Sequence, residues 1–356
     1  MQSKKKPGAL PFFSSSTKDN KMNRSIKIAI AGSGMIVPTA LECIREAGGY
    51  DIVAISVRPH SLEKGLSLAE EWNIGPEGEF SPSAVYTDYG RMLSESGGDF
   101  VYIAIVNSGH FTYAKKALMA GKNVILEKPF CTKKEDADEL AALAKEKGLY
   151  IFEAISSLHN PNFSLLQESL PRIGDVSMVQ CNFSQYSSRY DAYLEGRVSP
   201  SFNPQMGGGS FMDLGIYSVD IVTALFGAPS SAEFFPRTGF NGVDTSSVAV
   251  LKYPGMTAVV CSAKDSGSPS GIIFQGNKGW IKVEGTPNEM AGMTICVRGE
   301  GESVSFDTRK NKGRLTDEFI SFRDIFLKKD YGSMLSFLGH TLDGMTAVGM
   351  CRTDLI

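Results

Sequence analysis

Apolar strands and amphipathic helices alternate along the first part of the chain, and this alternation restricts its possible folds more than any other feature. Short apolar runs bounded by glycine and charge occupy residues 27–30, 52–57, 100–106, 124–126 and 150–155. Helical stretches follow the first four runs, one ending at residue 47 and the others spanning 62–72, 110–120 and 134–147. Strands that alternate with helices form a parallel sheet covered on both faces. The sequence therefore predicts an α/β fold with a doubly wound, Rossmann-type sheet over residues 25–150.

The pattern changes after residue 160, where one helical stretch is followed by many strands separated by turns. The predicted strands are residues 176–183, 231–235, 247–252, 258–262, 271–275, 280–284 and 293–297, with closing helices at 317–326 and 334–351. Turn sequences at 253–255 and 276–279 suit hairpins. We expect a second, α+β domain over residues 151–356 with an antiparallel sheet, whose C-terminal helix can pack back on the first domain. Residues 1–24 are predicted to be a disordered leader.

Composition excludes several classes of protein. The 356 residues carry a formal net charge of -3 and include no long basic block interleaved with aromatic residues, which argues against a nucleic-acid partner. No run approaches the roughly 18 apolar residues that a membrane span needs. Six cysteines are scattered without a C-x-x-C pair, which favours a reducing, cytoplasmic location. Four histidines lack zinc-ligand spacing, so no metal is expected, and a small molecule is the expected partner.

A glycine turn follows the first predicted strand. It comprises Gly32, Ser33, Gly34, Met35 and Ile36. Turns of this kind let backbone N–H groups approach a pyrophosphate at a helix N-terminus. The third glycine of the dinucleotide fingerprint is replaced by Val37, so the alternative is a tight turn without a ligand. Its place in the first βα unit favours a nicotinamide dinucleotide cofactor.

The end of the second strand indicates which dinucleotide binds. An acidic residue here would accept a hydrogen bond from the ribose 2′-OH of NAD, but the strand ends in Val57-Arg58. A guanidinium without a nearby acid suits a 2′-phosphate, with Ser56 and His60 as further neighbours. NADP is therefore favoured over NAD. The alternative is that Arg58 is an ordinary solvated loop residue.

A single lysine stands where the fourth strand should end, in Glu127-Lys128-Pro129. Ligands of open parallel sheets bind outside the carboxyl ends of the strands, so Lys128 is expected to face cofactor and substrate. The alternative is a surface lysine before a proline turn.

A glycine-rich helix start at residues 207–220 carries a second group of polar residues. Asp213, Tyr217 and Asp220 are spaced i, i+4 and i+7, which places them on one helical face beside an apolar face. Such a stripe can line a pocket. The alternative is a surface face with Tyr217 half-buried.

Taken in order, these segments resemble the glucose–fructose oxidoreductase/inositol dehydrogenase (Gfo/Idh/MocA) family, as do Asn107 with His110, the run 242–244 and the run 276–279. The resemblance implies a dinucleotide domain and a second domain whose large, mostly antiparallel sheet forms a homodimer or homotetramer interface. It also implies hydride transfer between nicotinamide and a carbinol carbon of a sugar, polyol or diol. Lys128, often before a cis proline, and the Asp213/Tyr217 pair match the family's catalytic residues. Tyrosine rather than histidine resembles the dihydrodiol and NADP-xylose dehydrogenase branch, while Val106 and Leu158 depart from the family pattern.

These residues predict a mechanism. A free tyrosine is a poor base at neutral pH, because its pKa is about 10. We expect the ammonium of Lys128 to lower the pKa of Tyr217, the acid/base, while Asp213 orients substrate or Lys128. The expected cofactor contacts are Gly32, Ser33, Gly34, Met35, Ile36, Ser56, Arg58, Asn107, His110, Glu127 and Lys128. The expected substrate contacts are Lys128, Arg189, Tyr190, Asp213 and Tyr217.

Two other functions are compatible with the resemblance. One is a cofactor-sensing regulator of the same fold, which would tend to lose the lysine or its partner, whereas this chain keeps Lys128, Asp213 and Tyr217. The other is an NAD-dependent glycosidase, against which Arg58 argues mildly.

Overall fold

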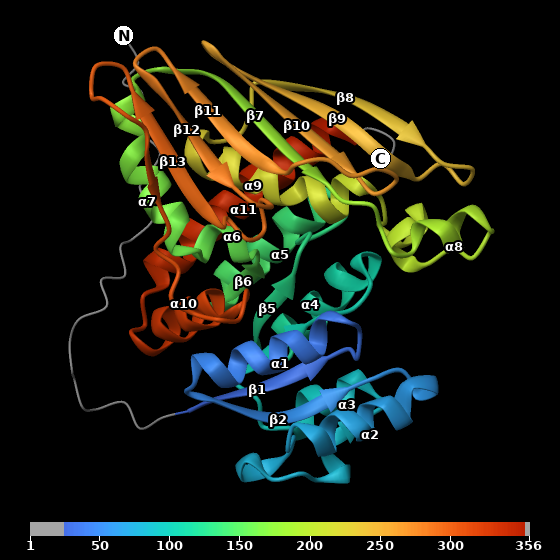
Figure 1. The fold of residues 1–356 in the computed structure, drawn as a ribbon. Coiled ribbons are helices and arrows are strands. Elements are labelled where there is room, and N and C mark those ends of the chain that lie inside the picture. Colours follow the sequence, from blue (N-terminus) through green and yellow to red (C-terminus); the bar gives the residue numbers. More distant parts are fainter. Residues whose placement is uncertain (1–24, 353–356) are drawn as a thin grey trace.

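The first domain contains a parallel sheet of six strands in the order β3-β2-β1-β4-β5-β6 (Figure 1). A computed structural model describes residues 25–352. The strands are β1 (Ile26–Ala31), β2 (Tyr50–Ser56), β3 (Val85–Tyr86), β4 (Phe100–Ile103), β5 (Asn123–Glu127) and β6 (Ile151–Ala154). The order reverses between β1 and β4, which is where open α/β sheets bind their ligands. The predicted leader lies outside the described residues.

Helices connect these strands, and the sequence predicted each of them except the third. They are α1 (Ile36–Ala47), α2 (Leu62–Glu71), α3 (Tyr89–Glu95), α4 (His110–Met119) and α5 (Lys134–Lys147). Strand β4 is shorter than expected, because its pairing with β1 ends at Ile103. The pattern also missed β3 and α3. A strand of two residues has no periodicity to detect, and α3 spans only seven residues.

The second domain is built on an eight-stranded sheet in the order β14-β13-β12-β11-β7-β10-β9-β8. The strands are β7 (Val176–Ser184), β8 (Ser231–Thr238), β9 (Asp244–Tyr253), β10 (Met256–Ala263), β11 (Gly271–Gly276), β12 (Gly279–Glu284), β13 (Gly292–Val297) and β14 (Val304–Phe306). Within the described part of this second sheet, the pairing of β7 with β10 is parallel and the other pairings are antiparallel. The predicted antiparallel character is therefore confirmed, while the exposed edge strand β14 was missed.

One face of this sheet is covered by helices. These are α9 (Ile216–Phe226) and α11 (Tyr331–Cys351), which pack against each other below the strands in Figure 1. Smaller helices, α6 (Ser156–His159), α7 (Pro161–Ser169) and α8 (Tyr190–Leu194), join the two domains or flank the sheet. Strand residues alternate accordingly: Val179 and Cys181 are buried, whereas Met178 and Gln180 are exposed.

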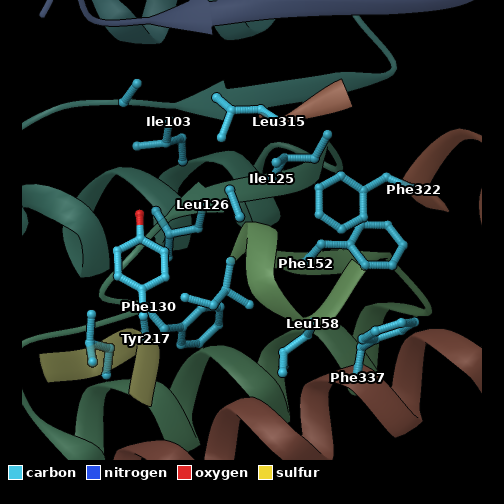
Figure 2. Packing of buried hydrophobic residues seen from close by; sticks show 14 of the residues in the cluster. Ile103, Ile125, Leu126, Phe130, Phe152, Leu158, Tyr217, Leu315, Phe322 and Phe337 are labelled. Carbon is cyan, nitrogen blue, oxygen red and sulfur yellow. The ribbon is translucent and has the colours of Figure 1, made fainter. Parts of the chain in front are cut away.

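Two C-terminal elements return to the first domain. Helix α10 (Thr316–Leu327) packs on α1, and the hydroxyl of Tyr50 donates to the carbonyl of Phe319 at 2.7 Å. Helix α11 lies against α5 and β6. The core is therefore continuous between the domains, and Figure 2 shows Phe152 of β6 beside Phe322 of α10, with ring centroids 4.6 Å apart.

The apolar stretch Pro204–Phe226 is long enough to cross a membrane by composition alone, but 78% of its most apolar window is buried inside the protein, as in a core helix. All six cysteines are unpaired, in agreement with the scattered spacing.

Candidate active site

A cleft of about 550 Å³ lies between the carboxyl ends of the parallel strands and the second domain. Its lining combines the glycine turn, the end of β2, the loop after β4 and part of the second domain. Asp213 is the only carboxylate among the lining residues in the described part of the chain. A cleft with one acid and several cations suits an anionic ligand.

The glycine turn forms the floor of this cleft. Gly32 has φ +118°, and a Cβ at this position would lie 2.2 Å from the carbonyl oxygen of Ala104, so only glycine fits. Ser33, Gly34, Met35 and Ile36 line the cleft ahead of α1. Val37, the departure from the fingerprint, is completely buried between α1 and the sheet. The turn therefore fits a dinucleotide pyrophosphate at a helix N-terminus.

The end of β2 contributes a cationic rim. Ser56 and Arg58 line the cleft as predicted, and Ser61 and Lys64 of the following turn and helix join them. His60 does not line it. Ser61 and Lys64 were not among the predicted contacts, although their spacing of three and six residues after Arg58, about one and two helical turns, was a usable signal.

Asn107 and His110 differ in position, because one lines the cleft and the other is buried behind it. Asn107 lines the cleft and donates its side-chain N–H to the carbonyl of Gly207 at 2.8 Å, which ties the two domains together. His110 is buried behind the cleft, with its ring nitrogens 2.8 Å from the Pro129 carbonyl and 3.3 Å from the Ile105 carbonyl. Burial lowers the pKa of His110. The structure therefore makes His110 a brace for the cleft wall rather than a lining residue.

Glu127 is also buried, which differs from its expected role as a cofactor contact. Its carboxyl group accepts from the hydroxyl of Tyr102 at 2.5 Å and from the backbone N–H of Lys128 at 3.2 Å. Burial raises its pKa, although Tyr102 and Lys128 oppose the change. Glu127 thus fixes the end of β5 from behind.

Lys128 and Asp213 are brought together by the two domains. The Lys128 Nζ donates to the Asp213 carbonyl at 2.8 Å and to its Oδ1 at 3.1 Å. Asp213 lies in a π-helical turn, Phe211–Gly215, which precedes α9, and such wide turns are frequent at functional sites. The Lys128-Pro129 bond is cis, as the resemblance implied.

Tyr217 lies beneath this pair. The Lys128 ammonium is 4.8 Å from the centroid of its ring, which is a cation–π distance. Figure 2 shows the Tyr217 hydroxyl directed away from α9, toward the sheet that carries Ile103. Tyr217 is 5% exposed, so the surface alternative is wrong.

The electrostatics of this cluster differ from the expectation in one respect. Burial raises the pKa of Tyr217, and the opposing charges of Lys128 and Arg314 do not outweigh it. The structure therefore favours a neutral phenol over the tyrosinate that the sequence predicted. Burial also disfavours the charge on Lys128, but Tyr217, Asp213 and Glu127 together raise the pKa of Lys128. Lys128 is a stable ammonium.

The side chains of Arg189 and Tyr190 lie in different surroundings. The guanidinium of Arg189 lines the cleft and contacts the sulfur of Met35 on the glycine turn, on the cofactor side. Tyr190 packs among Tyr186, Tyr193 and Phe202 in the small lobe around α8 and does not line the cleft. The substrate contacts assigned to both residues stay predictions.

Two cations near the centre were not predicted. Lys264 follows β10 and donates to the Asp213 Oδ2 at 2.7 Å. Arg314 precedes α10, with Nη1 3.5 Å from Ser156 Oγ, and its charge favours ionisation of Tyr217. Lys264 and Arg314 both lie in loops without a recognisable motif, so only the tertiary fold brings them close to Asp213 and Tyr217. Among the residues that the structure describes, no group of His, Cys, Asp and Glu could hold a metal ion.

Comparison with known proteins assigns the family. Residues 26–154 match the oxidoreductase family model with an NAD-binding Rossmann fold, and residues 171–282 match the GFO/IDH/MocA C-terminal domain. The chain belongs to the Gfo/Idh/MocA oxidoreductase family. It is an NAD(P)-dependent oxidoreductase by this membership.

Relatives in the family agree with the branch indicated by Tyr217. The chain is 32% identical over 259 residues to the scyllo-inositol 2-dehydrogenase (NADP(+)) IolU of Bacillus subtilis, covering 73% of this chain and 76% of that protein. It is 28% identical over 258 residues to the trans-1,2-dihydrobenzene-1,2-diol dehydrogenase of Xenopus tropicalis, covering 70% and 72%. The fold resembles that of KijD10, a 3-ketoreductase from Actinomadura kijaniata, with a TM-score of 0.78, 20% identity and coverage of 93% and 98%.

Proposed function

We propose that this family member transfers hydride between NADP(H) and a secondary alcohol or ketone carbon of a sugar, polyol or cyclic diol. The observation that carries the proposal is the placement of Lys128 between Asp213 and Tyr217, beside a cleft that fits a dinucleotide. Such a site unites a cation for the substrate oxygen with a phenolic proton. The inositol and dihydrodiol dehydrogenases among the relatives support this class of substrate.

Lys128 polarises the substrate oxygen in this proposal. An ammonium has three N–H donors, and in the described structure Asp213 accepts from Lys128 through its carbonyl and its carboxylate. The remaining donor is free for a substrate oxygen. Because the Lys128 side chain is only 15% exposed, its charge acts in a weakly screened environment. A bound nicotinamide supplies or accepts the hydride.

Tyr217 exchanges the proton. Its raised pKa keeps the phenol protonated at neutral pH, so it is ready to donate to the oxygen of a ketone. The same group accepts that proton in the oxidative direction, where Lys128 and Arg314 stabilise the tyrosinate.

NADP preference rests on the rim at the end of β2. Arg58, Ser61 and Lys64 line the cleft there, and the one lining carboxylate of the described chain, Asp213, is already paired with Lys128 and Lys264. Two cations and a hydroxyl suit a 2′-phosphate. The NADP-dependent relative IolU supports the same assignment.

Arg58→Ala should raise the KM for NADPH by about 30-fold, because one charge-assisted hydrogen bond contributes about 2 kcal/mol. The KM for NADH should change less than about threefold, since NADH lacks the phosphate. Steady-state kinetics with both cofactors measure the split. Arg91→Ala, which removes an exposed arginine paired with Glu95, is the matched control. An equal rise in KM for both cofactors would contradict this role of Arg58.

The substrate class is tested by a panel of aldoses, inositols, keto-inositols and trans-dihydrodiols, each assayed with NADP(H) and NAD(H). We expect turnover within this panel and a preference for NADP(H). Cofactor binding without turnover of any panel member would instead support a sensing role for the protein.

We also propose that the open face of the eight-stranded sheet pairs with a second copy. Met178 and Trp280 lie in one register row across β7, β11 and β12, and both are exposed, as is Phe235 of β8. Exposed apolar residues gathered on one sheet face are typical of an interface. Light scattering should give a mass at least twice the 38.5 kDa of the chain. A monomeric mass at micromolar concentration would contradict it.

A further inference from the structure

Asp213 lies between two lysines. Its Oδ1 accepts from Lys128 at 3.1 Å, and its Oδ2 accepts from Lys264 at 2.7 Å. Lys128 belongs to the first domain and Lys264 follows β10 of the second, so the carboxylate connects two domains through one group. The proposed chemistry uses only one of these two cations.

The position of Lys264 is closely specified by its surroundings. Its side chain is 4% exposed, its Nζ donates to the Ser201 carbonyl at 2.9 Å and lies 4.4 Å from the Phe202 ring centroid. Its backbone N–H donates to the carbonyl of Thr245 at 2.8 Å. A buried ammonium is costly unless it is paired, and Asp213 is the carboxylate that pairs it.

Asp213 is the more exposed partner of the Lys264 ion pair. Its side chain is 35% exposed and borders the cofactor cleft. A carboxylate held through one oxygen can rotate about its side-chain torsions, whereas two ammonium groups on different oxygens fix its orientation. The orientation of Asp213 in turn fixes that of the Lys128 ammonium, since Lys128 donates to both its carbonyl and its carboxylate.

We propose that Lys264 is a positioning residue of the active site, which holds the Asp213 carboxylate in the orientation that aims Lys128 at the substrate oxygen. This inference rests on the proposed function. It assigns a role to a residue that neither the family motifs nor the sequence pattern distinguished. The predicted contribution is to turnover more than to cofactor binding, because Lys264 contacts Ser201 and Asp213 of the second domain, whereas the glycine turn and the end of β2 that fit the dinucleotide belong to the first.

The charge of Lys264 also bears on pH dependence. Burial opposes ionisation of Asp213, but Lys128 and Lys264 together hold the pKa of Asp213 well below its usual range. Removing Lys264 should raise the pKa of Asp213. On acidification, activity that requires the Asp213 anion should therefore be lost at a higher pH in the variant than in wild type. The other ionisable groups around the two lysines are Tyr217, Glu127, Asp244, Glu153, Asp220 and His110.

The test is a double-mutant cycle of Lys264→Met with Asp213→Asn on the full chain. Alone, Lys264→Met should lower kcat by about 30- to 100-fold, the loss that a misplacement of about 1 Å produces. In the Asp213→Asn background the same change should cost less than about threefold, because there is no carboxylate left to position. Lys264→Arg, which keeps the charge, should recover most of the lost turnover.

Two further readouts separate positioning from loss of structure. The dissociation constant for NADPH, measured by its fluorescence, should stay within about twofold of wild type, whereas a collapsed cleft would weaken it. The acid limb of the pH–rate profile should move to higher pH in Lys264→Met alone and stay in place in Lys264→Arg. Lys145→Met, at an exposed lysine of α5, is the control for the substitution itself.

If the losses of kcat from Lys264→Met and Asp213→Asn were additive, and the acid limb of the pH–rate profile did not move, the role of Lys264 would be overturned. The proposed function would remain intact. Absence of turnover by the wild-type protein across the substrate panel would overturn the proposed function, and the catalytic role of Lys264 with it.

Discussion

Replacing Lys128 by methionine is expected to lower turnover by at least about a hundredfold, because it removes the cation that stabilises charge on the substrate oxygen. Methionine retains an unbranched side chain of similar length in the 15% exposed site. Asp213 would not become an unpaired buried charge, since Lys264 still donates to its Oδ2. The loss should therefore appear in kcat and not as unfolding.

Cofactor binding distinguishes this loss from general damage. Lys128 does not line the dinucleotide cleft, so the dissociation constant for NADPH should change less than about threefold in Lys128→Met. Lys145→Met, which alters an exposed lysine of α5, should leave both quantities unchanged. Turnover above about one per cent of wild type in Lys128→Met would contradict the assignment of Lys128 as the oxygen-binding cation.

Replacing Tyr217 by phenylalanine is expected to lower ketone reduction by about a thousandfold, within the range that general acid catalysis supplies. The ring that lies 4.8 Å below the Lys128 ammonium is retained, so the packing of the 5% exposed residue should survive. The thermal midpoint should consequently shift little. The substitution therefore removes the hydroxyl proton while keeping the ring, so its effect reports on the proton alone.

The pH dependence follows from the direction of the pKa change. The phenol is the active form in reduction, and its activity is lost as pH rises through the pKa of Tyr217. Because burial raises that pKa above the ordinary value of about 10, Tyr217 should cause no fall in the reduction rate between neutral pH and about pH 10. A basic limb near pH 8 that disappears in Tyr217→Phe would contradict the neutral phenol.

The parallel sheet could be predicted from the sequence because each strand is a short apolar run followed by an amphipathic helix. Glycine and charge mark the ends of these runs, so the strand ends that carry Gly32, Arg58 and Lys128 could be placed as well. The two-residue strand β3 could not, because so short a strand has no periodicity. Strand β14 has only three residues, all of them exposed, which is too short a run to show a strand pattern in the sequence.

The site was predictable only where a motif marks it. Lys128, Asp213 and Tyr217 lie in recognisable segments, and the structure brings them together. Lys264 lies 51 residues after Asp213 in the sequence, in a loop that carries no recognisable motif. The pairing of β10 with β7 and β9 brings this loop to Asp213. Arg314 lies near the site because α10, which it precedes, packs back on the first domain.

Burial is the other quantity that the sequence does not provide. Glu127 and His110 were expected to contact the cofactor because they belong to segments that resemble the family's, but both are more than nine-tenths buried and brace the cleft from behind. The net effect on the pKa of Tyr217 depends on the same unknown, since burial and the charge of Lys128 act in opposite directions.

Hydride transfer at the Lys128 and Tyr217 site is the central claim, and isotope transfer tests it most directly. Purified protein is incubated with NADPH carrying deuterium at C4 of the nicotinamide and with keto-inositols and keto-sugars, and the products are analysed by mass spectrometry. We expect a product alcohol with a single deuterium on the carbinol carbon, formed by wild type and nearly absent with Tyr217→Phe. NADPH binding without deuterium transfer to any member of the panel, with either face of the nicotinamide labelled, would contradict it.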